Sequence, residues 1–395
     1  MVRKGEFLIY LVAGEPSGDI LGARLMSALK HLAPNVRFSG VGGNAMESEG
    51  LESLFPMHDL SVMGVMEVLP KLPKIIRRLN ETARDATQKE PAALVTIDSP
   101  DFCFRLAHRL KNQEFPLFHY VAPSVWAWRQ GRAKKVSQYY DQIFCLLPFE
   151  PPYFINEGLN ANFVGHPITE DFAKFGNGES FRKRHQIHSD ETVLCVLPGS
   201  RNGEISRLMP VFSKTFDILK SKGRQFRLVL PTLDSVSSIV RKNAKNWPGA
   251  PIIVEDGAEK LDGFSASNVA LAASGTVSLE LAMAGVPSVI TYKVADLTAW
   301  LIRKMLQVKH VSLINLVLNG EYVPELLQEN CRPETLASEI IQLLDNPVIA
   351  KKQLVAFEKV IKILKGSGEG TPTTRTARLI LNAIRKDTEQ NSKVY

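Results

Sequence analysis

The chain alternates short apolar runs with longer amphipathic stretches along both of its halves, and this alternation restricts the fold more than any other feature. The strand-like runs of the first half occupy residues 7–13, 36–41, 92–97, 117–121, 143–147 and 162–164. Those of the second half occupy residues 192–197, 226–231, 251–254, 268–272 and 287–292. Strands that alternate with helices form βαβ units, which build parallel sheets covered by helices on both faces. We therefore expect an α/β protein with two Rossmann-like domains that face a central cleft, followed by C-terminal helices.

The 395 residues exceed one ordinary domain, and the restart of the pattern suggests where to divide them. We predict an N-terminal domain over residues 1–168 and a second domain over residues 169–365, with a polar linker at residues 170–190. A glycine-rich break precedes a helical tail over residues 366–395. The apolar residues of this tail need a surface to cover them. That surface belongs either to the N-terminal domain of the same chain or to a partner subunit, which would make a homodimer.

Two glycine-marked turns in the second half each connect an apolar run to a helical stretch. The first contains Gly199, Ser200 and Arg201, and the second contains Ser274, Gly275 and Thr276. Free backbone N–H groups at such helix N-termini favour anions, and an arginine adds a forked donor suited to phosphate. Glu280 follows about one helical turn later, where its carboxylate could accept bonds from sugar hydroxyls. The pair of turns predicts a nucleotide diphosphate site, although either turn alone would be ordinary for an α/β sheet.

The strand ends of the first half carry carboxylates. Glu15 lies in the turn GEPSGD, where Ser17 or Asp19 is expected to cap the following helix. Asp98 ends another strand, and a strand end is where a general base belongs, so catalysis and helix capping are both open for it. For Asp101, three residues later, we favour capping.

The segment APSVWAWRQGR at residues 122–132 follows a further strand and contains two tryptophans beside two arginines. These side chains could stack on a sugar or clamp an acidic substrate. A buried tryptophan pair is an equally good interpretation.

The balance of 48 lysines and arginines against 41 acidic residues gives a net charge of +7 and a pI near 9.1. This charge suits an anionic partner but does not choose among nucleotides, nucleic acids and acidic lipids. The four cysteines form no CxxC pair and are interpreted as buried thiols of a reducing compartment, and an isolated HxxH at residues 185–188 is assigned to the surface. We predict no metal site, no signal peptide and no spanning helix.

One segment has the spacing of an amphipathic helix with basic residues between its apolar ones. Its apolar residues are Val62, Met63, Val65, Met66, Val68, Leu69, Leu72 and Ile76. The interleaved basic residues are Lys71, Lys74, Arg77 and Arg78. A segment of this kind can lie in the interface of an anionic membrane. The competing interpretation is a core helix broken by Pro70 and Pro73.

Taken together, the motifs resemble those of the lipid-A-disaccharide synthase family, inverting glycosyltransferases of the GT-B type. The matching stretches are VAGEPSGD at 12–19, GVGG at 40–43, MGVMEVLP at 63–70, IDSPDF at 97–102, YVAPSVWAWRQGR at 120–132, LPFE at 147–150, FVGHP at 163–167, LPGSR at 197–201 and ASGTVSLELA at 273–282. They run in family order over most of the chain, which makes the match far more specific than any single turn.

The resemblance implies a donor, UDP-2,3-diacylglucosamine, and an acceptor, 2,3-diacylglucosamine 1-phosphate, also called lipid X. The products would be a β-1,6-linked disaccharide 1-phosphate and UDP. No metal or other cofactor is implied. The enzyme would be cytoplasmic and bound peripherally to the inner membrane of a Gram-negative cell, with the anionic membrane surface as its partner.

The resemblance also assigns roles to the candidate residues. Asp98 would take the proton from the acceptor 6-hydroxyl, and Glu15 would position sugar hydroxyls or support Asp98. Arg201 would stabilise the leaving diphosphate together with Gly199 and Ser200. The remaining expected substrate contacts are Ser274, Gly275, Thr276, Glu280 on the ribose, and Asn315.

Two other functions stay open at this point. A UDP-sugar epimerase shares the two-domain architecture but has no need of the apolar segment at residues 62–76. A basic nucleic-acid-binding protein would fit the charge, but no basic cluster with interleaved aromatic residues spans a face of the chain except at residues 126–132. We therefore expect no nucleic acid partner.

Overall fold

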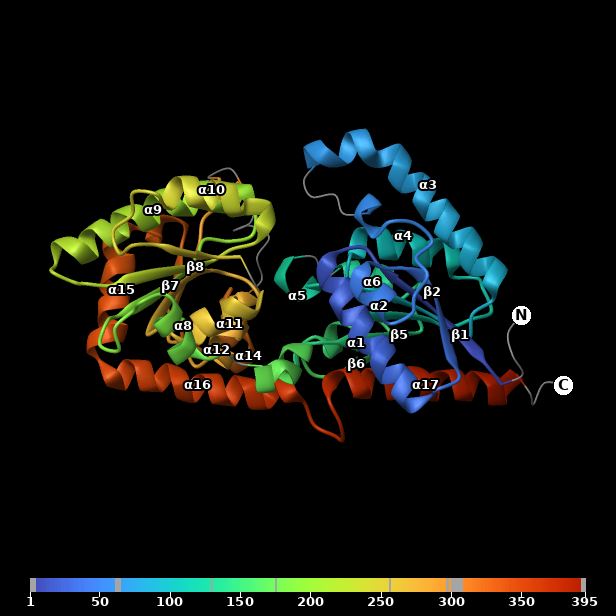
Figure 1. Cartoon of the computed structure of the whole chain (residues 1–395). Coiled ribbons are helices and arrows are strands. Elements are labelled where there is room, and N and C mark those ends of the chain that lie inside the picture. The colour runs from blue at the N-terminus through green and yellow to red at the C-terminus, as the bar shows by residue number, and fades with distance from the viewer. Residues whose placement is uncertain are drawn as a thin grey trace. The chain divides into compact units, whose positions relative to one another are not determined.

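The computed structural model describes residues 5–60, 65–128, 131–174, 176–255, 257–295, 298–299 and 308–391, and the side chains at 65–71, 128, 171–174 and 387–391 lie outside this description. Two compact units are present (Figure 1). Unit 1 comprises Met1–Pro167 together with Leu364–Tyr395, and unit 2 comprises Ile168–Ile363.

Unit 1 is built on a six-stranded sheet with the order β2-β1-β3-β4-β5-β6, in which all neighbours are parallel. Its strands are β1 (Phe7–Ala13), β2 (Val36–Val41), β3 (Ala93–Ile97), β4 (Leu117–Tyr120), β5 (Gln142–Cys145) and β6 (Asn160–Phe163). Its helices are α1 (Pro16–Leu32), α2 (Asn44–Ser48), η1 (Met57–Asp59), α3 (Val65–Lys89), α4 (Pro100–Leu110), α5 (Val125–Trp128), α6 (Gly131–Val136), α7 (Pro151–Ile155) and α17 (Pro372–Asn391).

Both faces of this sheet are buried, which explains why its central strands are apolar throughout rather than alternating. In β1, Tyr10 and Val12 join the core beneath α3 and α4, whereas Ile9 and Leu11 join the core on the opposite face. The C-terminal helix α17 contributes to that second core through Ala377, Ile380 and Leu381, and it packs beside α1 (Figure 1). The apolar side of the tail is therefore covered within its own chain.

A single arginine fixes the start of α17 to the end of the sheet. Arg375 donates to the carbonyl of Val164, which follows β6, at 3.0 Å. Its guanidinium also donates to the carbonyls of Lys365 and Gly370. The three carbonyls come from two segments far apart in sequence, so one side chain joins the end of the first 167 residues to the returning tail.

Unit 2 repeats the design with the strand order β12-β11-β10-β7-β8-β9, again parallel throughout. Its strands are β7 (Val193–Leu197), β8 (Arg227–Pro231), β9 (Ile252–Val254), β10 (Val269–Ala273), β11 (Ser288–Tyr292) and β12 (Glu325–Leu327). Its helices are η2 (Pro167–Lys174), α8 (Gly178–Arg184), α9 (Asn202–Ser221), α10 (Asp234–Ala244), α11 (Gly257–Ser265), α12 (Val277–Met283), α14 (Leu313–Leu318), η3 (Gln328–Asn330), α15 (Pro333–Asp345) and α16 (Pro347–Lys365).

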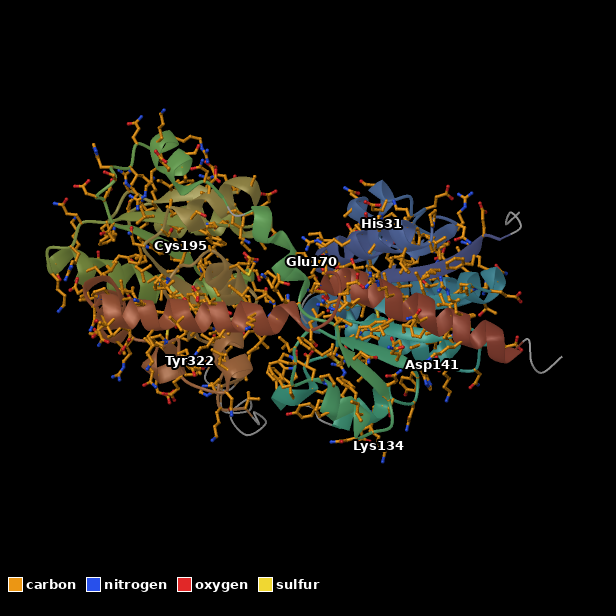
Figure 2. The ribbon with its side chains drawn as sticks, turned by 90° about the horizontal axis from the view of Figure 1, so that it is seen from below. His31, Lys134, Asp141, Glu170, Cys195 and Tyr322 are labelled. Atoms are coloured by element: carbon orange, nitrogen blue, oxygen red, sulfur yellow. The ribbon has the colours of Figure 1, made fainter. Side chains whose placement is uncertain are left out.

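The predicted α/β class with two parallel sheets is confirmed. The predicted linker at residues 170–190 is wrong in part, because it contains α8, whose Phe181 is fully buried in a small core with Val193 and Val229. The four cysteines are free and buried as expected, and Figure 2 shows Cys195 inside unit 2.

Candidate active site

In unit 2 the predicted nucleotide residues surround one cavity of about 400 Å³. It lies at the carboxyl ends of β7, β8 and β10, where the strand order reverses between β7 and β10. Ligands of open parallel sheets bind at such reversals. The predicted residues that line this cavity are Gly199, Ser200, Arg201, Ser274, Gly275, Thr276 and Glu280.

The turn after β7 folds around the carboxylate of Glu204, a residue that the sequence analysis did not select. Glu204 accepts a hydrogen bond from the backbone N–H of Ser200 at 3.2 Å and lies 3.5 Å from the Arg201 guanidinium. Gly199 has a φ of +110°, and a side chain there would meet the Glu204 carboxylate at 2.5 Å. Tyr292 donates to the same carboxylate at 3.4 Å. Burial is the main cause that raises the pKa of Tyr292, and the negative charge of Glu204 is the second. A carboxylate therefore already occupies the Ser200 N–H of this turn.

A second missed residue, Lys260 of α11, lines the cavity and forms an ion pair with Glu280 of α12. The ion pair places a cation beside the carboxylate that is expected to contact a sugar. Lys260 lies on the helix before that of Glu280, and no sequence motif connects the two residues. Only the fold brings them together.

Asn315 lies outside this cavity and is 1 % exposed. Its amide donates to Val323 O and to Glu325, both at 2.8 Å. Glu325 in turn accepts from the N–H of Val311, whose carbonyl accepts from the Ser274 hydroxyl at 3.0 Å. Asn315 is thus connected to the cavity through the turn that holds Ser274.

In unit 1, Asp98 and Glu15 lie at the carboxyl ends of the adjacent strands β3 and β1. The hydroxyl of Ser17 donates to Asp98 at 3.1 Å. Asp98 and Ser99 have φ values of +52° and +43°. Such backbone conformations cost energy in residues other than glycine and concentrate at functional sites.

The neighbouring strand end is strained as well, because Val121 after β4 has a φ of +79°. For a β-branched residue this conformation is a genuine outlier. Gly14 leaves the room that the crowded turn needs, since a side chain at Gly14 would meet the Ser99 hydroxyl at 2.5 Å.

Both capping expectations of the first half, one for Ser17 or Asp19 and one for Asp101, are wrong. Asp19 does not cap its own helix, because its carboxylate accepts from the N–H groups of Gly43, Ala45 and Met46 at the start of α2. Ser17 binds Asp98 instead. Asp101 makes no capping bond and pairs with Arg132 at 2.8 Å.

Trp126 belongs to the core rather than to a sugar-stacking surface. It is 8 % exposed and donates from Nε1 to Glu150 at 3.1 Å. Burial raises the pKa of Glu150 to about 7, against the opposing effect of the N–H donors around it. The side chain of Trp128 and the whole of Arg129 lie outside the described residues.

The apolar segment at residues 62–76 is described only in part. Val62 and Met63 lie outside the described residues, as do the side chains of Val65, Met66, Val68 and Leu69. From residue 65 the chain forms the continuous helix α3, which passes through Pro70 and Pro73 without a break. Leu72 is half-buried, and Ile76 is 41 % exposed.

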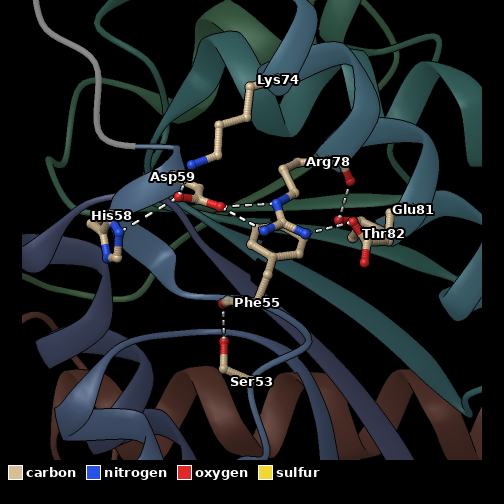
Figure 3. A network of polar contacts seen from close by, with 8 residues as sticks. All are labelled: Ser53, Phe55, His58, Asp59, Lys74, Arg78, Glu81 and Thr82. Carbon is tan, nitrogen blue, oxygen red and sulfur yellow. Dashed lines mark hydrogen bonds and ion pairs between the residues drawn. The ribbon is translucent and has the colours of Figure 1, made fainter. Parts of the chain in front are cut away.

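Two of the four basic residues of this segment are held by a buried acid (Figure 3). Lys74 and Arg78 point from α3 to Asp59, and Arg78 binds it through Nε at 2.9 Å and Nη2 at 2.7 Å. The hydrogen bond from Lys74 contributes most to lowering the pKa of Asp59. Arg78 also lies 4.4 Å above the ring of Phe55. These contacts anchor α3 to its unit, so Lys74 and Arg78 are less available to a membrane than the sequence suggested.

Among the described residues, no three histidine, cysteine, aspartate or glutamate side chains gather in a way that could hold a metal ion. The same part of the chain contains no helix with both the length and the apolar character required to cross a bilayer.

Comparisons with solved structures place this fold among known ones. The chain resembles the UDP-GlcNAc 2-epimerase of Neisseria meningitidis bound to UDP-GlcNAc, with a TM-score of 0.62, 10% identity, and coverage of 90% of this chain and 98% of that one. It resembles MurG of Acinetobacter baumannii with a TM-score of 0.58, 12% identity, and coverage of 95% and 99%. At these identities the likeness shows the GT-B fold alone.

Sequence comparisons are more specific. The model of the Lipid-A-disaccharide synthetase family matches residues 9–372. The lipid-A-disaccharide synthase of Rhodospirillum centenum is 47% identical over 382 residues, which cover 96% of this chain and 95% of that protein. The epimerase alternative shares the fold but not this sequence match. The chain therefore belongs to the lipid-A-disaccharide synthase family, glycosyltransferases of lipid A biosynthesis.

Proposed function

We propose that this protein transfers 2,3-diacylglucosamine from UDP-2,3-diacylglucosamine to the 6-hydroxyl of 2,3-diacylglucosamine 1-phosphate. In this reaction the acceptor oxygen bonds to the anomeric carbon of the donor, the bond from that carbon to the diphosphate breaks, and UDP leaves. Attack from the face opposite the diphosphate inverts the anomeric centre and gives the β-1,6 linkage. Residues 169–365 hold the donor, and residues 1–168 hold the acceptor.

The donor site is the cavity at the carboxyl ends of β7 and β10. The N–H groups of Gly199 and Ser200 and the guanidinium of Arg201 receive the diphosphate, and Ser274, Gly275 and Thr276 add further donors. Glu280 contacts the ribose from its ion pair with Lys260. Asn315 acts through Glu325 and the turn that holds Ser274, as its hydrogen bonds suggest.

Asp98 is the proposed base that takes the proton from the attacking hydroxyl, with Glu15 positioning the acceptor beside it. The observation that carries this assignment is the strained turn at the end of β3, where Asp98 accepts from Ser17. Arg201 stabilises the charge that develops on the leaving diphosphate, an electrostatic contribution that is commonly the largest in such reactions. The proposed chemistry needs no metal and no other cofactor.

We also propose that the protein attaches peripherally to the cytoplasmic face of the inner membrane through the segment at residues 62–76. The exposed Ile76 and the basic Arg77 support this attachment at the described end of the segment. The acyl chains of both substrates would enter from the same surface.

The decisive experiment mixes the protein with the two lipid precursors in detergent and detects the disaccharide 1-phosphate by mass spectrometry. Asp98→Ala should lower kcat by about 10²–10⁴, the range of general-base catalysis, while UDP binding stays unchanged. Asp101→Ala is the matched control, since Asp101 is also a carboxylate at the start of α4 but pairs with Arg132. Normal turnover of Asp98→Ala, or a loss confined to Asp101→Ala, would show that the base is another group.

A further inference from the structure

A hollow of about 620 Å³ opens on the surface of unit 1 between the first turns of α4 and α6. From α4 it is lined by Asp101, Phe104 and Arg105. From α6 and the turn after it come Arg132, Lys135 and Tyr139. The roles proposed above for unit 1, a base and a membrane segment, make no use of this hollow.

Three cations and one carboxylate line the hollow, so it attracts anions. The single carboxylate, Asp101, is 91% exposed and is bonded only to Arg132 among the described residues. An ion pair this exposed contributes little and is easily exchanged for another anion. Arg132 itself is better fixed, because its guanidinium lies 5.2 Å from the Phe104 ring and its side chain is 24% exposed. Within the described part of the chain, neither Arg105 nor Lys135 has an acidic partner.

The hollow lies at the same edge of the sheet as Asp98. The helix α4 begins at Pro100, two residues after Asp98. The N–H of Asp98 donates to Tyr120 O at 3.0 Å, so the ends of β3 and β4 are side by side. The bond from Arg132 to Asp101 brings the first turn of α6 beside the first turn of α4, which begins two residues after the proposed base. The N-terminus of α4 adds partial positive charge there.

We propose that this hollow binds the phosphate monoester of the acceptor sugar. The proposal rests on the proposed function, which supplies a sugar with a phosphate at position 1 and a reacting hydroxyl at position 6. The two ring carbons that flank the ring oxygen carry these groups, C1 the phosphate and C5 the exocyclic arm with the hydroxyl, so the two groups leave the sugar as separate arms. A hexose that presents its hydroxyl to Asp98 can therefore extend its phosphate into a hollow that begins one helical turn away.

The chemistry of the walls fits a phosphate monoester. Such a group carries a charge of about −1.5 to −2 at pH 7 and three acceptor oxygens. Arg132 and Arg105 present forked donors that match these oxygens, and Lys135 adds a point charge. Binding exchanges the exposed bond from Arg132 to Asp101 for bonds to the phosphate. The rings of Phe104 and Tyr139 bound the hollow on its apolar sides.

The test compares the acceptor with and without its phosphate. The variant R105A/K135A removes the two unpaired cations, and R109A/K134A is a matched control with one exposed cation removed from each of the same helices. Figure 2 shows Lys134 at the outer edge of its unit. Activity is measured in detergent with 2,3-diacylglucosamine 1-phosphate and with 2,3-diacylglucosamine.

In the native protein the phosphate should raise the acceptor kcat/KM at least 30-fold. In R105A/K135A this preference should shrink at least tenfold, with the donor KM unchanged and the melting temperature within 2 °C of the native value. The control variant should keep the full preference. If R105A/K135A keeps it as well, the phosphate is bound elsewhere and the proposal is overturned.

Direct binding separates this proposal from the proposed reaction. Calorimetry should detect glucosamine 1-phosphate binding to the native protein, with at least tenfold weaker binding to R105A/K135A. If binding follows the hollow but no disaccharide forms, the proposed reaction fails and the phosphate site stands. If disaccharide forms but the native protein does not bind the sugar phosphate, the site fails and the reaction stands.

A membrane headgroup is the other source of a phosphate, and vesicles distinguish it. Binding to phosphatidylglycerol vesicles should be the same for R105A/K135A as for R109A/K134A. A selective loss of vesicle binding by R105A/K135A, with its phosphate preference intact, would assign the hollow to lipid headgroups and overturn the proposal.

Discussion

Replacing Glu204 with glutamine should make the protein bind UDP more tightly. The Glu204 carboxylate accepts from the N–H of Ser200 and lies 3.5 Å from Arg201, the two groups proposed to receive the diphosphate. Before a diphosphate can use them, this carboxylate has to leave. The glutamine amide keeps the size of the side chain and one acceptor oxygen, but it binds these groups less strongly and does not repel a diphosphate.

The size of the effect follows from these two contacts. A hydrogen bond to a charged group contributes about 1.5–3 kcal/mol, against about 0.5–1.5 kcal/mol for a neutral one. Replacing the carboxylate with an amide should therefore lower the free energy needed to free the Ser200 N–H by about 1 kcal/mol. The ion pair with Arg201 adds little, because 63% of the Arg201 side chain is exposed and such pairs are worth about 0–1 kcal/mol. Together these give about 1–2 kcal/mol, which corresponds to a Kd for UDP roughly 5–30-fold lower.

Isothermal titration of UDP measures this directly. Asp234→Asn is the control, because Asp234 is also a first-turn acid of a helix in unit 2 and is exposed outside the cavity lining. Loss of the acid near the start of α9 should cost no more than about 1 kcal/mol of stability. Unchanged or weaker UDP binding by a normally folded Glu204→Gln would refute the reasoning and leave Glu204 with only a structural role in the turn after β7.

Three other expectations concern both units. Arg201→Ala should raise the Kd for UDP about 10–100-fold and lower kcat as well, whereas Glu280→Ala should mainly weaken binding, as titration and steady-state kinetics would show. Ile76→Ser should weaken binding to anionic vesicles about tenfold and leave the melting temperature unchanged. Ile20, which is 51% exposed on α1, provides the control, since Ile20→Ser should change neither quantity. A lower melting temperature of Ile76→Ser without loss of vesicle binding would assign Ile76 to the core. Asp59→Asn should lower the melting temperature at pH 7. Because the pKa of Asp59 is lowered from 3.8, the stabilisation by its carboxylate is complete above that pH and is lost below it. Scanning calorimetry should therefore show the difference in melting temperature between the variant and the native protein shrinking as the pH falls below 3.8.

The strands were predictable because burial on both faces makes them continuously apolar. The structure has β1 and β2 at the predicted residues, and the other predicted strands differ by one or two residues at their ends. The strand β12 (Glu325–Leu327) was missed because it is three residues long and begins with an acid. The helix α8 was missed because only Phe181 of its seven residues is buried, and one apolar residue gives no periodic signal.

The residues of the candidate site also include some that the sequence indicates and others that it does not. Turns that follow strands are visible in sequence, and those at 199–201 and 274–276 do line one cavity. Lys260 was not visible, because its ion pair with Glu280 depends on which helices the sheet order brings together. Glu204 lies in the turn after β7, but its position in the sequence did not indicate that its carboxylate would accept from the Ser200 N–H. The order β10-β7-β8 places the turns of distant segments beside each other, and no local spacing encodes that order.

The backbone strain at Asp98 is the clearest case of a property that only tertiary contacts can hold. Two residues before it, the buried Thr96 hydroxyl lies 2.8 Å from both His119 Nδ1 and the Tyr140 hydroxyl. Tyr140 in turn donates to Cys103 O in the first turns of α4. The segment that carries Asp98 is therefore held on both sides by a buried polar network. Left-handed φ values at two successive residues would relax in a free turn, and they persist here because relaxing them would break these buried hydrogen bonds. The buried network thus offsets the energetic cost of a strained backbone that fixes one carboxylate, as is expected if Asp98 is the proposed base, whose action would depend on its position.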